Sequence, residues 1–172
     1  GGTIAVWSDQ STQFAGSASA RGAGKGNSGL VETSGGSLTV ADGATVDAGA
    51  PVGLAGDWLI DPTNISIKNS GGTVSPATIE NSLANNDVTE PTTNGTITVY
   101  DQIAYNSSHN LNLLAGGDIY IAADIQNSST GAINVVAGWD GTTTNPALFG
   151  NSGVYGNGGS VYVTSDYDLD PI

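Results

Sequence analysis

The segment GDWLIDPTNISI, residues 56–67, packs a tryptophan-led apolar strand, an Asp-Pro turn and a second alternating strand into one short unit. Asp61 and Pro62 supply the turn, because an Asp side chain closes a turn locally and proline has no N–H with which to continue a strand ladder. Apolar and polar residues alternate on both sides of that turn, as in strands with one buried face. A unit of this kind is typical of one coil of a β-solenoid.

Short runs of the same kind recur along the chain. Clusters of Gly, Asn, Asp and Ser separate them, as at residues 22–29 and 106–110, and these residues favour turns because Gly reaches positive φ and Asn or Asp side chains close the turn. The runs expected to form strands are Thr3–Ser8, Thr12–Ala20, Ser37–Val40, Ala44–Ala48, Trp58–Ile60, Asn64–Lys68, Gly95–Ala104, Leu111–Leu114, Asp118–Ile125, Ala132–Ala137 and Gly159–Ser165.

The spacing of similar units is roughly twenty residues, as from Leu113 to Ile133, each of which precedes an Ala-Gly corner. Two or three short strands in that length make about one rung of a parallel β-helix, in which each strand pairs with its counterpart in the next rung. A β-sandwich shows the same alternation, but it prefers hairpin turns and larger aromatic core residues, and 6% of this chain is aromatic. The sequence therefore predicts an all-β chain folded as a parallel β-helix.

One segment departs from the strand pattern. Ser75 precedes Pro76 at the first position of a predicted short helix over residues 76–85, and Ile79 and Leu83 lie on one face of it. We expect those two side chains to pack on the flank or over an end of the coil stack; the alternative is a helix that binds a partner's groove. The chain is predicted to form a single domain, 1–172, with first rungs at 1–70, a helix-containing insertion at 71–92 and later rungs at 93–172.

The charge balance excludes several classes of partner. Three Lys and Arg residues stand against 16 Asp and Glu, a net charge of −13, and the three cations are Arg21, Lys25 and Lys68. Binding to nucleic acid or to an anionic membrane surface needs clustered cations, so neither partner is expected. No apolar run is long enough for a membrane-spanning helix, so no membrane insertion is expected either. With no Cys, disulfides and thiolate metal sites are excluded as well.

Residues that carry chemistry are sparse. His109 is the single histidine and lies in a predicted turn, so neither a nucleophilic triad nor a histidine zinc site is expected. Paired carboxylates are the stronger enzymatic hypothesis, with Asp118 and Asp124 as one candidate pair. The tail acids form another candidate group and are also the candidate calcium ligands: Asp166, Asp168 and Asp170. The favoured interpretation is that these acids are solvated turn residues, with no catalytic residue, bound metal or cofactor.

The aromatic residues divide between core and surface. Trp7 and Trp58 border apolar strands and are predicted to fill the core. Trp139 and Tyr155 are candidate carbohydrate contacts, because exposed aromatic rings stack on sugars. Strand-face packing is expected for the remaining tyrosines considered: Tyr100, Tyr105, Tyr120 and Tyr162.

Taken together, the stretches GGTIAVWSDQSTQFAGSASARG, GLVETSGG and VDAGAPVGLAGDWLIDPTNISI resemble segments of filamentous haemagglutinin-type exoproteins, the large bacterial adhesins exported by two-partner secretion. The later stretches GTITVYDQI and LNLLAGGDIYIAADI are similar to further rungs of that family. The residues that carry the resemblance are Trp7, Phe14, Arg21, Glu32, Trp58, Asp61 and Pro62, of which the tryptophans, Phe14, Asp61 and Pro62 are expected to be structural.

The resemblance implies a right-handed parallel β-helix that is secreted or attached to the cell surface and acts in adhesion, aggregation or a biofilm matrix without catalytic residues. Host or matrix carbohydrate or protein is the implied partner. Because family members are far longer, the chain is expected to be either a cut fragment or a short subunit that polymerises. Strands close to both ends favour head-to-tail self-association. The alternative function is a β-helix enzyme, a lyase or glycoside hydrolase, that acts on polysaccharides through paired carboxylates.

Overall fold

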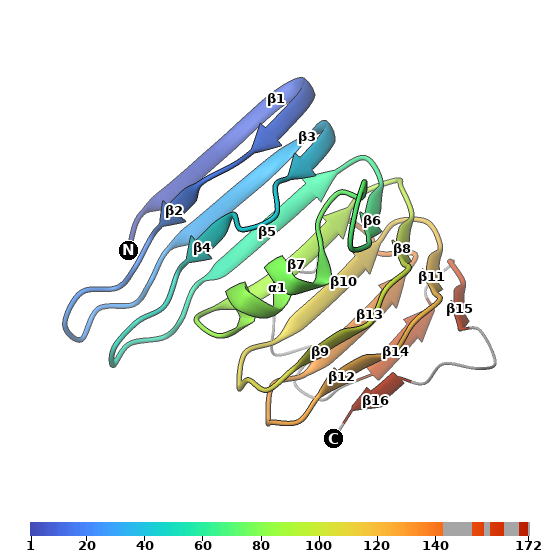
Figure 1. The fold of residues 1–172 in the computed structure, drawn as a ribbon. Coiled ribbons are helices and arrows are strands. Elements are labelled where there is room, and N and C mark those ends of the chain that lie inside the picture. Colours follow the sequence, from blue (N-terminus) through green and yellow to red (C-terminus); the bar gives the residue numbers. More distant parts are fainter. Residues whose placement is uncertain (143–152, 157–158, 164–168, 172) are drawn as a thin grey trace.

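The computed structural model describes residues 1–142, 153–156, 159–163 and 169–171, which form one short helix and a series of strands (Figure 1). The helix is α1 (Pro76–Leu83). The strands are β1 (Thr3–Phe14), β2 (Ser17–Ser19), β3 (Leu30–Val40), β4 (Thr45–Asp47), β5 (Asp57–Pro62), β6 (Ile65–Ile67), β7 (Asp87–Thr92), β8 (Ile97–Val99), β9 (Ile103–Tyr105), β10 (Leu111–Ala115), β11 (Ile119–Ile121), β12 (Ile125–Asn127), β13 (Ile133–Ala137), β14 (Gly153–Gly156), β15 (Val161–Val163) and β16 (Leu169–Pro171).

The strands form parallel sheets whose order follows the chain. A seven-stranded sheet runs β1-β3-β5-β7-β10-β13-β14, and smaller sheets contain β6-β8-β11-β15, β9-β12-β16 and β2-β4. The chain therefore returns repeatedly to the large sheet and adds the next strand beside the previous one (Figure 1). Every strand pair among the described residues is parallel, which confirms the predicted all-β parallel fold and contradicts the hairpins of a β-sandwich.

The register corrects the predicted repeat length. Leu111 pairs with Ile133 and Leu113 with Val135, so equivalent positions here lie twenty-two residues apart, and the predicted match of Leu113 with Ile133 was wrong. A shift of two residues leaves every side chain on the same face of a strand, so alternation by itself does not distinguish the two registers.

One core joins the sheets, because residues at equivalent positions in successive strands stack on one another. Ile4, Val31, Trp58, Val88 and Leu111 are consecutive partners across the large sheet. All except Ile4, which lies on the edge strand β1 and is partly buried, are fully buried. Stacking of this kind buries apolar surface along the whole sheet. Burial stabilises the folded state by about 25 cal/mol for each Å² of apolar surface removed from water.

The two tryptophans singled out by the sequence behave differently. Trp58 is fully buried as predicted; its indole Nε1 donates to Thr33 Oγ1 at 3.1 Å, and its ring lies 6.4 Å from that of Phe14. Trp7 is 64% exposed, so the prediction that it fills the core was wrong. Val6 packs against the core, and strand alternation turns the next residue outward.

Helix α1 contacts three of the sheets. It packs against β4, β7 and β9 (Figure 1). Ile79 and Leu83 are fully buried in the shared core. Ser75 occupies the predicted N-cap position, but its hydroxyl makes no capping hydrogen bond to a backbone N–H and contacts Thr78 Oγ1 instead. Within the helix, Glu80 extends its side chain to β9, where Glu80 Oε1 accepts from the Ala104 N–H at 2.7 Å. The insertion therefore replaces strand pairing with helix packing at this side of the stack.

No helix in the part of the chain that the structure describes is both long enough and apolar enough to cross a bilayer.

The stacking account predicts different effects for the two tryptophans. Trp58→Ala should lower the free energy of unfolding by about 3–5 kcal/mol, because it leaves a large cavity and removes the indole donor to Thr33. Trp7→Ala, the matched control, should change it by less than about 0.5 kcal/mol, because the side chain is mostly solvated. Chemical denaturation followed by circular dichroism measures both; equal losses would contradict the assignment of Trp58 to the core.

Candidate functional site

The candidate site is a shallow groove of about 320 Å³ on the outer face of the large sheet, where β1, β3 and β5 lie side by side (Figure 1). Its floor is a row of residues in lateral register, Trp7 on β1, Ser34 on β3 and Asp61 on β5. Because neighbouring strands lie about 4.8 Å apart, this row spans about 10 Å. An exposed indole thus stands at one end of the row and a carboxylate at the other.

Glu32 supplies a second carboxylate to the groove. It lies on β3 two residues before Ser34, whose hydroxyl donates to Glu32 Oε1 at 2.8 Å and so fixes that oxygen. Burial raises the pKa of Asp61 above its ordinary value, and the nearby negative charge of Glu32 raises it further. The two acids therefore share one electrostatic environment, although twenty-nine residues separate them in the chain.

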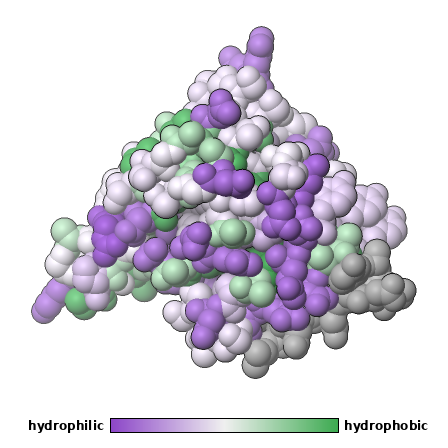
Figure 2. Space-filling model, in the orientation of Figure 1, coloured by the Kyte–Doolittle hydropathy of each residue, from purple (hydrophilic) through white to green (hydrophobic). Residues whose placement is uncertain are grey.

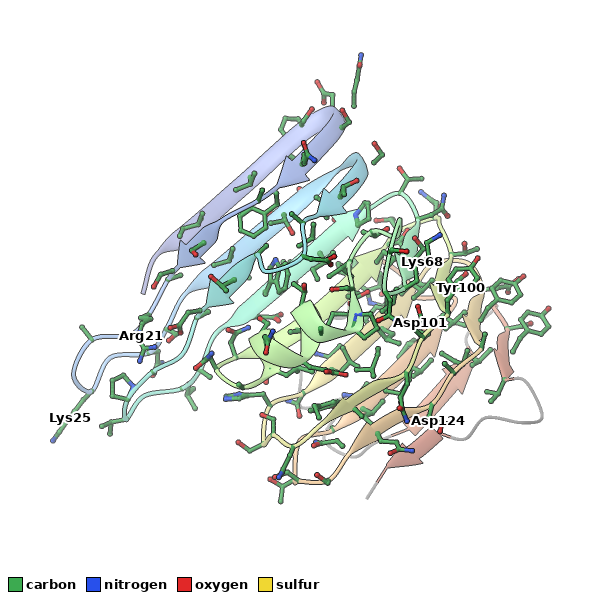
Figure 3. The ribbon with its side chains drawn as sticks, viewed as in Figure 1. Arg21, Lys25, Lys68, Tyr100, Asp101 and Asp124 are labelled. Atoms are coloured by element: carbon green, nitrogen blue, oxygen red, sulfur yellow. The ribbon has the colours of Figure 1, made fainter. Side chains whose placement is uncertain are left out.

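No cation compensates these acids. Arg21 forms an ion pair with Asp47 at 2.5 Å, and the Lys68 ammonium lies 5.6 Å from the ring centre of Tyr100 (Figure 3). Lys25, the third cation of the chain, lies in the loop between β2 and β3 (Figure 3). None of the three lines the groove.

A β-bulge shapes the rim. Ser8 pairs with Gly35 and Ser11 with Ser37, so Asp9 and Gln10 together face the single residue Gly36. A Cβ at Gly36 would lie 2.8 Å from the Gln10 carbonyl oxygen, which explains the glycine. Bulges re-aim side chains, and this one leaves Asp9 as a third acid of the groove lining.

Of the acids proposed from the sequence as catalytic pairs, the structure describes Asp118 and Asp124 fully and Asp170 by its backbone alone. Asp118 and Asp124 precede strands of two different sheets, and Asp118 accepts from the Ser160 N–H at 2.8 Å. Asp166 and Asp168 lie outside the described residues, and of Asp170 the structure describes only its place on β16, opposite Gln126. Among the described residues no group of three His, Cys, Asp or Glu side chains is arranged to hold a metal ion.

The two candidate carbohydrate contacts, Trp139 and Tyr155, lie outside the groove. Trp139, a candidate carbohydrate contact, is partly buried against Leu114 and Val136. Tyr155 lies on β14, opposite Val136, and its side chain is outside the described part of the structure.

The remaining tyrosines divide between the outer faces and the core. Tyr120 and Tyr162 stack with ring centres 4.9 Å apart on the outer face of the β6-β8-β11-β15 sheet, and Tyr100 is exposed beside Lys68. Tyr105 is buried in the core.

His109 and its serine neighbour also have structural partners. His109 Nδ1 lies 3.5 Å from Asp87 Oδ1, and the Ser107 hydroxyl donates to the Leu83 carbonyl at 2.5 Å. Ser107 is therefore not positioned as a nucleophile for His109.

A polar ladder on the outer face of the large sheet ends at a buried acid. Asn134 donates to Asn112, Asn112 to Thr89, and Thr89 to Asp57, with distances of 2.8, 3.0 and 2.8 Å. Burial raises the pKa of Asp57 to about 6 despite the Thr89 bond, which lowers it. The ladder ties four successive strands together and leaves the Asp57 carboxyl away from solvent.

Glu90 is a second buried acid and lies inside the apolar core. It follows Val88 on the inward face of β7, pairs with Leu113 of β10, and neither of its carboxyl oxygens has a hydrogen-bond partner among the described residues. Burial raises its pKa to about 8. At neutral pH the group is therefore mostly protonated, since an isolated charge is disfavoured in an apolar core.

Comparison with protein-family models, with curated proteins and with solved structures found no match to this chain. The resemblance to filamentous haemagglutinin-type exoproteins stays a prediction.

Glu90 should make the protein sensitive to alkaline pH. Its folded pKa of about 8 exceeds the ordinary 4.5, so the folded state retains this proton and stability should fall as pH rises from about 5 to 8. Glu90→Gln should remove that slope and stabilise the protein at pH 9 by on the order of 4 kcal/mol. Denaturant titrations between pH 5 and 9 measure both effects.

Glu80→Gln is the matched control, because it also removes one carboxylate, from the partly exposed side of α1. It should keep the slope of the unaltered protein. An unchanged slope in Glu90→Gln would contradict the assignment of a buried, neutral Glu90.

Proposed function

We propose that this chain is a segment of a right-handed parallel β-helix and serves as a structural and adhesive element of a secreted bacterial surface protein or extracellular fibre. The observation that carries the proposal is the stacking of equivalent residues across sheets whose strands follow chain order, exemplified by Val31, Trp58, Val88 and Leu111. Parallel strands joined by crossovers are right-handed in about 98% of cases, which favours that hand here. A coil stack of this kind grows by adding rungs without thickening its core.

The surface chemistry supports a scaffold. Charged residues are 11% of the chain, against about 25% in typical soluble domains. Polar and intermediate residues cover much of the face shown in Figure 2, with hydrophobic residues in smaller groups. Buried amides such as Asn112 and Asn134 hold strands together, so many of the polar side chains serve the stack itself.

Strand β1 supports self-association. Leu30 N–H donates to the Gly2 carbonyl, so alternation directs the N–H groups of Thr3, Ala5 and Trp7 away from β3. Among the described strands β1 has one neighbour only, and its inward residues Ile4 and Val6 are partly buried. A second copy whose opposite end pairs with β1 would satisfy these backbone groups and extend the core. Because this contact is heterologous and does not close, its repetition produces a filament.

Assembly through β1 is testable with one substitution. The unaltered chain should form oligomers whose sedimentation coefficient rises with concentration, and filaments should be visible by electron microscopy. Ala5→Pro removes an outward N–H without removing a bond to β3, so it should remain monomeric with a similar melting temperature. A monomer at every concentration in the unaltered chain would contradict assembly through this edge.

A polysaccharide-acting enzyme is the second candidate function. The specific observation in its favour is the proximity of Glu32 and Asp61 in an open groove, with the pKa of Asp61 raised by burial and by the charge of Glu32. Glycoside hydrolysis uses two carboxyl groups, one of which is kept protonated by its surroundings. New reducing ends released from a polysaccharide, and lost in Asp61→Asn, would establish this function.

A further inference from the structure

The groove presents three chemical features that one ligand must satisfy together. Trp7 exposes most of its indole, so the ring is available to stack on a ligand. Glu32 and Asp61 concentrate negative charge within reach of that ring, and no cation of the protein lines the groove. The lining hydroxyl of Ser34 is already committed to Glu32, so its donor proton orients the acid.

We propose that this groove binds a glycan that carries free amino groups, an oligomer of a deacetylated hexosamine. Trp7 stacks on the apolar face of a sugar ring, while Glu32 and Asp61 accept hydrogen bonds from an ammonium group and from hydroxyls. This inference rests on the proposed adhesive function and names the ligand of its surface.

The charges decide between classes of glycan. An anionic polysaccharide meets the acids of the groove and a chain of net charge −13, so like charges repel it. A neutral glycan can stack on Trp7, but it leaves the partly desolvated carboxylate of Asp61 without a counter-charge. An ammonium group supplies that counter-charge and forms charge-assisted hydrogen bonds, which are about twice as strong as neutral ones.

The direction of the groove decides between a glycan and a peptide. The Trp7-Ser34-Asp61 row crosses three strands of one sheet, at right angles to the strand direction. Extended peptides bind a sheet by adding a strand along its edge, parallel to the strands. A basic peptide laid across the row would gain no main-chain ladder, whereas a ring ligand needs only the stacking surface and the acceptors.

The position of the acids favours recognition over random attraction. Ser34 fixes one oxygen of Glu32, and the bulge opposite Gly36 leaves Asp9 on the groove. Preorganised acceptors lose little side-chain entropy when a ligand binds. The site is therefore expected to depend on particular side chains and not on net charge alone.

Isothermal titration with chitosan oligosaccharide tests the proposal, with its N-acetylated counterpart, oligogalacturonate and oligolysine as comparison ligands. We expect chitosan oligosaccharide to bind, the acetylated oligomer to bind at least about tenfold more weakly, and oligogalacturonate not to bind. Trp7→Ala and Asp61→Asn should each weaken binding by about tenfold, a change of about 1.4 kcal/mol. Asp42→Asn, which removes the same charge from an exposed loop outside the groove, should leave binding unchanged.

One further variant and a set of melting curves keep the test independent of folding. Trp7→Phe should recover part of the affinity lost in Trp7→Ala, because a ring is restored, and melting curves confirm that each variant is folded. Equal losses in Asp42→Asn and Asp61→Asn would overturn the proposal in favour of general charge attraction. Binding of oligolysine alone, lost in Asp61→Asn, would overturn it in favour of a basic peptide.

The same samples separate this inference from the proposed function. Sedimentation of Asp61→Asn reports on assembly through β1, since Asp61 lies on β5, away from that edge. If the unaltered chain assembles but binds none of the oligomers, the proposal of a glycan site is wrong and the proposal of a fibre is supported. If chitosan oligosaccharide binds and no assembly occurs, the proposal of a glycan site is supported and the proposal of assembly through β1 is wrong.

Discussion

In-register parallel pairing is the constraint on which the rest of this structure depends. Once Trp58 lies between Val31 and Val88, alternation determines whether each remaining residue of those strands faces the core or the surface. The short strands contribute little individually, but their contributions add because successive strands of the large sheet direct equivalent residues to the same face. Helix α1 is compatible with this pairing, because Ile79 and Leu83 pack into the core that the strands form.

The same pairing also builds the surface. Trp7, Ser34 and Asp61 lie far apart in the chain and adjacent across three strands, so the groove is a product of register. Its acids repel one another and have no cation of the protein beside them, an arrangement that favours an external positive group. The two acids buried elsewhere lie away from the groove. Asp57 ends a polar ladder, whereas Glu90 lies in the apolar interior with no hydrogen-bond partner among the described residues.

The sequence was sufficient for the fold class and for local elements, because those depend on nearby residues. Residues 56–67 form β5 and β6 as expected, but the predicted turn was displaced by two residues: Asp61 and Pro62 end β5, and the chain bends at Thr63 and Asn64. The predicted helix begins at Pro76 and ends two residues earlier than expected. The first part of β3 was missed, because Ser34, Gly35 and Gly36 resemble a turn, whereas the glycines accommodate a bulge in the neighbouring strand.

Properties that depend on long-range register were not accessible. The outward direction of Trp7 was hidden by the uninterrupted apolar run Ile4–Trp7, and the proximity of Glu32 to Asp61 has no local signal. Glu90 occupies an inward position of β7, where a charged residue type gives no sequence-level sign that it is buried and protonated.

Pairs of introduced cysteines test the register most directly, because the chain has none of its own. Thr98 and Tyr120 are partners on β8 and β11 with side chains on the outer face, whereas Thr98 and Ala122 are offset by two residues. Adjacent parallel strands bring partner Cα atoms within the usual disulfide range of about 4.4–6.8 Å. The account predicts rapid disulfide formation when Thr98→Cys is combined with Tyr120→Cys, and slow formation when Thr98→Cys is combined with Ala122→Cys. Equal rates, or faster oxidation of the offset pair, would contradict in-register stacking.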